Sequence, residues 1–378
     1  MALISEFDAR QLERTLDLAA RGGHEVSPNP LVGAVIMRDG AVIGEGYHHR
    51  AGGPHAEVEA IRSASQELRG ATLYVSLEPC CHQGRTPPCT DAIREAGFAR
   101  VVVASDDPSA HASGRGLGIL RDEGIEVVVA DGELAARARL LNQPFRKHAR
   151  TGRPLVVFKA AMSLDGKVAT RSGDSKWISG QSSRELVHAW RAASDAVAVG
   201  IGTALADDPL LTARVGGSDS SLPATSQPRR VIFDSLAKLP LSARVFSDPA
   251  GSPLTVVVSR AAPRAATDAL AARGAEVLCA TGENEQARVR SALDQLGALG
   301  VTSLLLEGGP KLAGAFLDAG EVDEVRLFVA PLLLGGRAAR VPLESEGVEL
   351  ISDALRALTL DCERIGEDLL LRARIREW

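Results

Sequence analysis

A short segment at residues 151–154, with the sequence Thr-Gly-Arg-Pro, interrupts a regular alternation of strand-like and helix-like segments along the chain. Strand–helix alternation predicts layered α/β domains, whereas Gly, Pro and basic residues with few apolar neighbours are typical of a linker. The chain has 378 residues, which is longer than a typical single domain and is about the length of two. We therefore expect an α/β protein with one domain at residues 1–150 and a second at residues 151–378.

Charge and hydropathy narrow the class of protein. The net charge is −5, the pI is about 6.0 and aromatic residues make up 3% of the chain, so nucleic acid is not expected as a partner. No basic segment precedes an apolar run at the N-terminus, and no apolar run is long enough to span a membrane. We expect a cytoplasmic protein. Three of the five cysteines fall within ten positions, which favours a metal site over disulfides.

Apolar periodicity predicts the elements of both domains. In the first domain we expect strands at residues 31–37, 42–47, 72–77, 101–104 and 125–129, and helices around 12–19, 56–63, 90–96 and 116–122. In the second we expect strands at 155–160, 196–199, 230–233, 254–258, 276–279, 303–306 and 324–330, and helices near 184–191, 265–273, 285–296 and 312–318. Residues 216–227 are rich in Gly, Ser and Asp and are expected to form a mobile surface loop.

His55, Cys80 and Cys89 have the composition of a catalytic zinc site. One His and two Cys suit Zn²⁺, and three protein ligands leave the fourth position to a water molecule. Zinc lowers the pKa of such a water toward about 7. Glu57, two residues after His55, could take the water's proton and deliver it to departing ammonia. Zinc deaminases share the order H-x-E followed by P-C-x₂-C, although here eight residues separate the two cysteines.

Other interpretations of the same residues stay open. Cys80 and Cys89 could be ordinary buried thiols, or Cys81 or His82 could be the fourth ligand of a structural zinc. The chain could also be a zinc-stabilised scaffold, a deaminase of a nucleoside or of RNA, or a reductase whose deaminase domain is inactive. Glu57 distinguishes an active deaminase from a scaffold, because a scaffold does not need it. RNA binding would favour a basic face, which the composition does not indicate.

The second half carries two glycine-containing turns, each after a predicted strand. Residues 200–203 read Gly-Ile-Gly-Thr, and residues 308–310 read Gly-Gly-Pro and open a predicted helix. Small residues there allow backbone N–H groups to approach a phosphate, and the helix dipole favours the anion. A plain turn explains the same pattern, and a G-x-G-x-x-G dinucleotide motif is not clearly placed.

Seven motifs in order along the chain resemble a known family. They are SPNPLVG at 27–33, GEGYH at 44–48, PHAE at 54–57, EPCCHQGRTPPC at 78–89, SLDGK at 163–167, TALADDP at 203–209 and EGGP at 307–310. Together they resemble the bifunctional riboflavin-biosynthesis deaminase–reductases of bacteria, over both halves of the chain. Two departures stand out: residues 107–110 read Asp-Pro-Ser-Ala where the family usually has Asp-Pro-Asn-Pro, and Cys81 stands where Ser is common.

The resemblance implies a cytidine-deaminase-like three-layer α/β/α domain followed by a dihydrofolate-reductase-like α/β domain. The first would use Zn²⁺ to hydrolyse the 2-amino group of 2,5-diamino-6-(5-phosphoribosylamino)pyrimidin-4(3H)-one. The second would use NADPH to reduce the ribosyl group of the product, 5-amino-6-(5-phosphoribosylamino)uracil, to ribityl. Reductases of this fold often pair, so we expect a homo-oligomer, a dimer or a tetramer.

The resemblance also assigns residues. His55, Cys80 and Cys89 match the zinc ligands and Glu57 the proton shuttle, while Asn29 and His48 match positions that hold the pyrimidine. The positions expected to bind the reductase substrate are Ser175, Arg191, Leu211, Arg214 and Glu307, with Lys159 at the ribose. The positions expected to bind NADPH are Ala161, Trp177, Thr203, Asp207, Ser235, Gly309, Pro310, Lys311, Leu312, Ala313, Gly314 and Ala315. Two arginines suit a 5′-phosphate, and Lys159 or Asp207 is the hypothesised proton donor.

Overall fold

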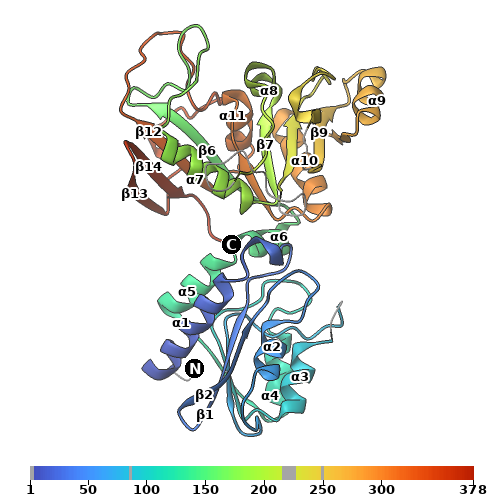
Figure 1. Cartoon of the computed structure of the whole chain (residues 1–378), viewed down its shortest axis with the longest axis vertical. Helices are drawn as coiled ribbons and strands as arrows, with labels where there is room; N and C mark the ends of the chain where they lie inside the picture. The colour runs from blue at the N-terminus through green and yellow to red at the C-terminus, as the bar shows by residue number, and fades with distance from the viewer. Residues whose placement is uncertain (1–3, 85–86, 215–226, 248–250) are drawn as a thin grey trace. The chain divides into compact units, whose positions relative to one another are not determined.

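The structure is a computed structural model that describes residues 4–84, 87–214, 227–247 and 251–378. The chain divides into two compact units, Met1–Gly152 together with Trp378, and Arg153–Glu377 (Figure 1). Most of the loop predicted at 216–227 lies outside the described residues. Gln227 is described, and it is buried with its side-chain amide bonded to the backbone of Ala213, so the prediction of an exposed loop is wrong at this residue.

The first unit is built on a five-stranded sheet in the order β2-β1-β3-β4-β5. Its strands are β1 Gly33–Arg38, β2 Ala41–Tyr47, β3 Thr72–Val75, β4 Arg100–Val103 and β5 Glu126–Val129. β1 runs antiparallel to β2 and β3, and β3, β4 and β5 are parallel. Asp39 and Gly40 join β1 to β2 with φ of +50° and +79°, and Asp-Gly is a favoured pair for a two-residue hairpin turn that needs positive φ at both positions.

Two layers of helices cover the two faces of this sheet. The helices are α1 Glu6–Ala20, α2 Ala56–Arg62, α3 Cys89–Ala96, α4 Arg115–Asp122, α5 Gly132–Leu141 and α6 Gln143–Thr151. Successive side chains of β1 point to opposite faces: Ala34 and Ile36 pack in the core with α2, α3 and α4, and Val35 and Met37 pack with α1 and α5. The unit is therefore a three-layer α/β/α sandwich.

The second unit contains a nine-stranded sheet in the order β10-β9-β8-β7-β11-β6-β12-β14-β13. Its strands are β6 Leu155–Ser163, β7 Ala196–Gly200, β8 Arg229–Phe233, β9 Leu254–Ser259, β10 Glu276–Ala280, β11 Ser303–Leu306, β12 Glu324–Ala330, β13 Thr359–Ile365 and β14 Asp368–Arg374. Neighbours from β10 to β12 are parallel, and β14 pairs antiparallel with both β12 and β13.

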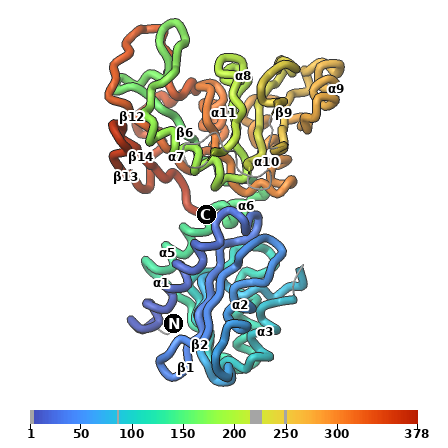
Figure 2. The backbone as a smooth tube through the Cα atoms, viewed as in Figure 1, coloured from blue at the N-terminus to red at the C-terminus, as the bar shows by residue number. Residues whose placement is uncertain are grey.

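Helices lie on both faces of this sheet, as the path of the backbone in Figure 2 shows. They are α7 Gln181–Ala192, α8 Ile201–Asp207, α9 Arg264–Ala272, α10 Glu285–Ala298 and α11 Pro310–Asp318, and short 3₁₀ turns are Gly23–Val26, Arg244–Ser247 and Ile351–Asp353. Leu293 of α10 and Phe316 of α11 are buried in one core with β11, whereas Val187 of α7 packs with Phe328 and Leu370 on the other face. Both faces of the parallel strands are thus covered.

The segment predicted as a linker is more ordered than its composition indicates. Thr151 is the last residue of α6, and Gly152 ends that helix with φ of +75°. The Arg153 guanidinium forms ion pairs with Asp294 and Glu321. None of the described helices has the length and apolar content that a membrane span requires.

Candidate active sites

Two helix starts and one loop bring together the side chains predicted to bind zinc. His55 is the residue before α2, Cys89 is the first residue of α3, and Cys80 lies in the loop after β3. His55 Nδ1 lies 3.1 Å from Cys89 Sγ and 3.5 Å from Cys80 Sγ, and the Cys89 backbone N–H donates to Cys80 Sγ over 3.3 Å. The three ligand atoms all lie within 4.8 Å of one another.

This cluster has the chemistry and the size of a tetrahedral zinc site. Bonds of about 2.0 Å to nitrogen and about 2.3 Å to sulfur at tetrahedral angles place neighbouring ligand atoms about 3.5 Å apart. Among the described residues, His55, Cys80 and Cys89 form the one group of this kind. Cys81 is directed elsewhere and donates to the backbone carbonyl of His111 over 3.4 Å, so the structure does not make it a fourth ligand.

Glu57 lies in the first turn of α2, two residues after His55, with a side chain that is almost fully buried. Burial raises the pKa of this carboxyl to about 7, and the negative charge of Cys80 acts in the same direction. The hydrogen bond from Cys89 lowers the pKa of the Cys80 thiol, which favours a thiolate at the cluster. A carboxyl group with a pKa near neutrality can both accept and release a proton at physiological pH.

A buried carboxylate supports the loop that carries Cys80. Glu78 accepts hydrogen bonds from the backbone N–H groups of Gly114, at 2.9 Å, and Gly116, at 3.1 Å, where α4 begins. A Cβ atom added to Gly116 would lie 2.3 Å from the Pro79 carbonyl oxygen, so the helix start and the loop touch backbone to backbone. Glu78 thereby attaches the metal loop to the start of α4.

Asn29 and His48 form a hydrogen-bonded pair beside the cluster. The Asn29 Nδ2 lies 3.0 Å from His48 Nε2, and His48 Nδ1 lies 2.8 Å from the Pro54 carbonyl oxygen. Because a carbonyl accepts only, Nδ1 donates and Nε2 accepts from the Asn29 amide. Burial lowers the pKa of His48, which keeps its ring neutral. The His48 and His55 rings meet edge to face at 5.4 Å, so the predicted pyrimidine residues and the metal ligands adjoin.

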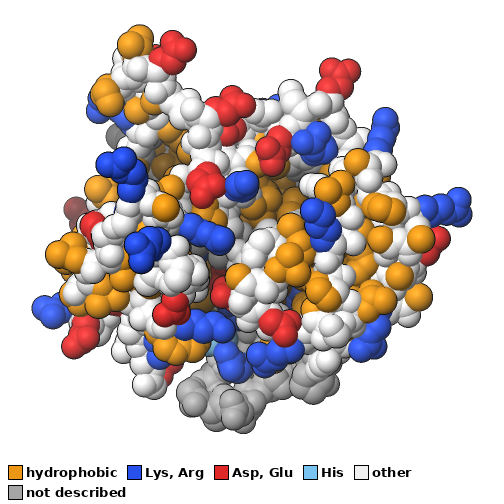
Figure 3. All heavy atoms as spheres, turned by 90° about the horizontal axis from the view of Figure 1, so that it is seen from above, with side chains coloured by type: hydrophobic (Ala, Val, Ile, Leu, Met, Phe, Trp, Pro, Cys, Tyr) orange, Lys and Arg blue, Asp and Glu red, His pale blue; other side chains and the backbone are white. Residues whose placement is uncertain are grey.

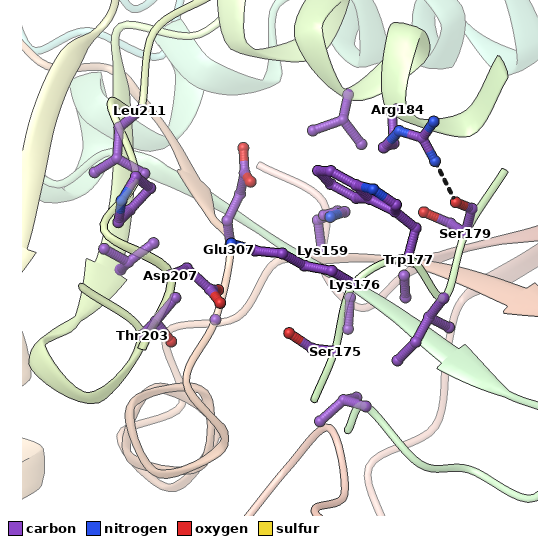
Figure 4. Close-up of a pocket in the computed structure, with 18 of the residues that line it drawn as sticks. Lys159, Ser175, Lys176, Trp177, Ser179, Arg184, Thr203, Asp207, Leu211 and Glu307 are labelled. Atoms are coloured by element: carbon purple, nitrogen blue, oxygen red, sulfur yellow. Dashed lines mark hydrogen bonds between the residues drawn. The ribbon is translucent and has the colours of Figure 1, made fainter. Parts of the chain in front are cut away.

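The second unit contains a cavity of about 900 Å³ at the carboxyl ends of β6, β7 and β11. Residues predicted to bind substrate or NADPH line it: Lys159, Ala161, Ser175, Trp177, Arg191, Thr203, Asp207, Leu211, Arg214, Glu307, Gly309 and Pro310. Figure 4 shows Thr203 and Asp207 across the drawn space from Ser175 and Trp177. Leu211 is buried and has a φ of +59°.

A buried ion pair lies at this cavity. The Arg191 guanidinium donates to both Glu307 carboxylate oxygens, over 2.6 and 2.8 Å, and to the Thr212 carbonyl over 3.0 Å. Burial alone would raise the pKa of Glu307, but the charge and hydrogen bonds of Arg191, together with the charge of Lys159, lower it to about 2. Burial lowers the pKa of Lys159, and the Glu307 carboxylate only partly offsets this. Arg191, predicted to bind phosphate, is therefore already paired with Glu307.

A second cavity of about 550 Å³ lies at the ends of β8 and β9 and is lined by Ser235, Lys311 and Leu312. Thr203, Gly309 and Pro310 line both cavities. Gly309 has φ of +64°, and a Cβ atom there would lie 3.3 Å from the Thr203 hydroxyl. The glycine turn before α11 thus needs glycine and presents backbone N–H groups at the start of a helix, which suits a phosphate.

Three of the residues predicted to bind NADPH lie elsewhere. Ala313 and Ala315 are buried in the main core of the unit, and a Cβ atom on Gly314 would lie 2.0 Å from the Glu344 carbonyl oxygen. None of the three is among the described residues that line the two cavities, because on α11 their face is turned to the sheet and to the 344 segment. Conversely, no motif or spacing in the sequence pointed to His188, which lines the larger cavity.

Each half of the chain matches a known protein family. Residues 154–371 match the model of the RibD C-terminal domain, which is more than half of the chain. The chain belongs to the RibD family. Residues 5–105 match the cytidine and deoxycytidylate deaminase zinc-binding region. The prediction of a cytidine-deaminase-like domain followed by a reductase domain is thereby confirmed.

Relatives in the RibD family match over nearly their full length. The riboflavin biosynthesis proteins RibD of Actinobacillus pleuropneumoniae and Escherichia coli are each 40% identical to this chain, covering 96% of it and 94% and 98% of the relatives. The solved structure of Acinetobacter baumannii RibD, 39% identical, matches with a TM-score of 0.85 over 98% of this chain and 99% of that one. A deaminase/reductase structure from Thermotoga maritima, 35% identical, matches with a TM-score of 0.81 over 98% and 99%.

Membership of the RibD family establishes the class of activity. The chain is a bifunctional deaminase and reductase of riboflavin biosynthesis, as predicted, with a deaminase zinc-binding region ahead of a reductase domain. On the face shown in Figure 3, acidic and basic side chains are intermingled.

Proposed function

We propose that the first unit hydrolyses the 2-amino group of 2,5-diamino-6-(5-phosphoribosylamino)pyrimidin-4(3H)-one, releasing ammonia. The observation that most directly supports this proposal is the cluster of His55 Nδ1 with two cysteine sulfurs, next to the buried carboxyl of Glu57. His55, Cys80 and Cys89 would hold one Zn²⁺ per chain. When bound, Zn²⁺ lowers the pKa of a water molecule and so supplies hydroxide at neutral pH.

The chain's own residues then account for binding and for proton movement. Glu57 holds a proton at its carboxyl oxygen and delivers it to the departing amine, consistent with its raised pKa. The Asn29 amide and the neutral ring of His48 bind polar edges of the pyrimidine. Because His48 is fixed by the Pro54 carbonyl, it presents one defined tautomer to the substrate.

Glu57→Gln tests the deaminase proposal. The variant keeps the shape of the side chain but cannot move a proton, so ammonia release should fall by about 10²–10⁴-fold. Zinc content should be unchanged, and NADPH oxidation with pre-deaminated substrate should stay at the wild-type rate. Wild-type ammonia release from the variant would refute the role of Glu57, and loss of folding would favour a structural zinc domain instead.

We propose that the second unit reduces 5-amino-6-(5-phosphoribosylamino)uracil with NADPH. The two cavities share the glycine turn at Gly309, so one extended cofactor could occupy both, with Ser235 and Lys311 along the smaller and Trp177 and Asp207 along the larger. NADPH, when bound, supplies a hydride, which C1′ of the ring-opened ribosylamine would accept. The protein aligns that carbon and excludes water.

The residues around the larger cavity divide the remaining tasks. Lys159 and Asp207 line the cavity, and either can supply the proton that the ring oxygen needs on opening. Because Arg191 forms an ion pair with Glu307, Arg214 is the arginine that would bind the 5′-phosphate. Lys159→Ala should lower the reductase turnover sharply and leave ammonia release unchanged. Full reductase turnover in this variant would exclude Lys159 as the donor.

A further inference from the structure

His188 lines the larger cavity of the second unit, one helical turn before Arg191 on α7. Its Nε2 atom lies 3.1 Å from a terminal nitrogen of Arg214. A guanidinium only donates, so Nε2 must carry the lone pair and the ring must be neutral, with its proton on Nδ1. Nδ1 is buried near the Thr212 backbone without a hydrogen bond of normal geometry. The ring is thus oriented with its acceptor toward Arg214.

The two arginines of the cavity differ in what holds them. Arg191 gives hydrogen bonds to both oxygens of Glu307, so its charge is already cancelled. Arg214 is exposed, and none of the ion pairs among the described residues includes it. Of the two, Arg214 therefore keeps a positive charge that a ligand can use.

We propose that His188 is a positioning residue: as a neutral acceptor, it holds the Arg214 guanidinium toward the 5′-phosphate of the reductase substrate. A carboxylate at this position would also hold Arg214, but it would cancel the charge and repel the phosphate. A neutral acceptor fixes the donor and leaves the charge intact. This inference rests on the proposed function, in which Arg214 binds that phosphate.

The surroundings of His188 keep it in the form that this role requires. Burial, and to a smaller extent the positive charges of Arg191 and Arg214, lower the pKa of His188 to about 4. The negative charge of Glu307, which pairs with Arg191, and the Thr212 backbone raise this pKa and oppose the lowering only in part. A protonated ring would lose its acceptor and repel Arg214, so the neutral state is the functional one.

Three variants of His188 in the full-length protein test the proposal. His188→Gln keeps a neutral acceptor. His188→Glu has nearly the shape of the Gln variant but adds a negative charge. His188→Phe removes the acceptor but keeps a ring. The substrates are 5-amino-6-(5-phosphoribosylamino)uracil and its dephosphorylated form, with NADPH oxidation as the readout. Removing a hydrogen bond to a charged group should raise KM for the phosphorylated substrate about tenfold or more.

The expected pattern separates positioning from a structural role. The Phe and Glu variants should raise KM for the phosphorylated substrate with kcat within about threefold of wild type, the Gln variant should bind nearly as wild type, and none should change KM for the dephosphorylated substrate. In an Arg214→Ala background, His188→Phe should cause little further increase in the KM for the phosphorylated substrate.

Several outcomes would overturn the proposal. These are an equal KM effect on both substrates, a Glu variant that binds as well as the Gln variant, or a full additional loss from His188→Phe in the Arg214→Ala background. If Arg214→Ala does not discriminate between the two substrates, Arg214 is not the phosphate ligand and the proposal falls. The reductase assignment would stand in that case, because NADPH oxidation by the wild-type protein measures it separately.

Discussion

Glu307→Gln perturbs the buried charge cluster of the second unit with little change in shape. It removes the carboxylate that accepts two hydrogen bonds from Arg191. The Arg191 side chain is 16% exposed and that of Glu307 is 7% exposed, so solvent can compensate little of the loss. We expect a less stable second unit, impaired reduction and unchanged ammonia release.

The expected loss of stability can be worked out in two ways, from the pKa of Glu307 and from the usual cost of breaking a buried ion pair. The environment lowers the pKa of Glu307 from 4.5 to about 2. One pH unit in a pKa corresponds to about 1.4 kcal/mol, so the folded state favours the carboxylate by about 3 kcal/mol. Removal of one partner from a buried ion pair typically costs about 3–5 kcal/mol, which agrees. We therefore expect the free energy of unfolding at pH 7 to fall by about 3 kcal/mol.

The sign of the pH dependence follows from the direction of this shift. A carboxyl group with a lowered pKa in the folded state stabilises the fold above its unfolded pKa, and this contribution is lost as the pH falls. For Glu307 the loss runs from pH 4.5 down to about 2. The stability difference between wild type and Glu307→Gln should thus be constant near neutrality and shrink across that window.

Urea denaturation followed by tryptophan fluorescence measures this effect, because Trp177 and Trp190 both lie in the second unit. Glu363→Gln is the matched control, since Glu363 pairs with Arg372 at 2.9 Å on the surface of the same unit. That exposed pair should contribute less than about 1 kcal/mol. A loss in Glu307→Gln no larger than in the control, or one that does not shrink at low pH, would refute the reasoning.

Three further predictions concern the first unit. Glu78→Gln should weaken support of the Cys80 loop and raise the zinc dissociation constant about tenfold, measured by competition with a chelating dye; unchanged affinity would contradict this. Gly46→Ala should lower the free energy of unfolding of the first unit by about 1–3 kcal/mol, because its Cβ would lie 2.5 Å from the Ala60 backbone nitrogen, and ammonia release should fall with it. Gly118→Ala, with open space around the added methyl group, is the control in thermal unfolding. Zinc chelation should abolish ammonia release and spare NADPH oxidation of pre-deaminated substrate; equal loss of both would argue against separate sites.

Local pattern predicted much of the fold, and tertiary context decided the rest. The Asp39-Gly40 hairpin and the buried strands were predictable because turn chemistry and apolar runs are local signals. α5 was missed because its Ala- and Arg-rich sequence has little apolar periodicity. β13 was missed because it is largely exposed at the end of the sheet, so its side chains show no buried alternation.

The candidate sites show the same division. His55, Glu57 and Cys80 could be predicted because the chemistry requires those residue types in that order. The pairing of Arg191 with Glu307 could not, because 116 residues separate them and only the sheet brings them together. Sequence reasoning accordingly gave both arginines one role, whereas the structure gives them different environments.

The residues proposed for each reaction come from only one of the two compact units. Those for deamination lie between Asn29 and Cys89, and those for reduction lie between Lys159 and Leu312. Two inactive copies of the gene, one altered at Glu57 and the other at Lys159, should therefore restore riboflavin synthesis when a cell carries both. Each protein would perform the step that the other has lost, with the intermediate passing through free solution.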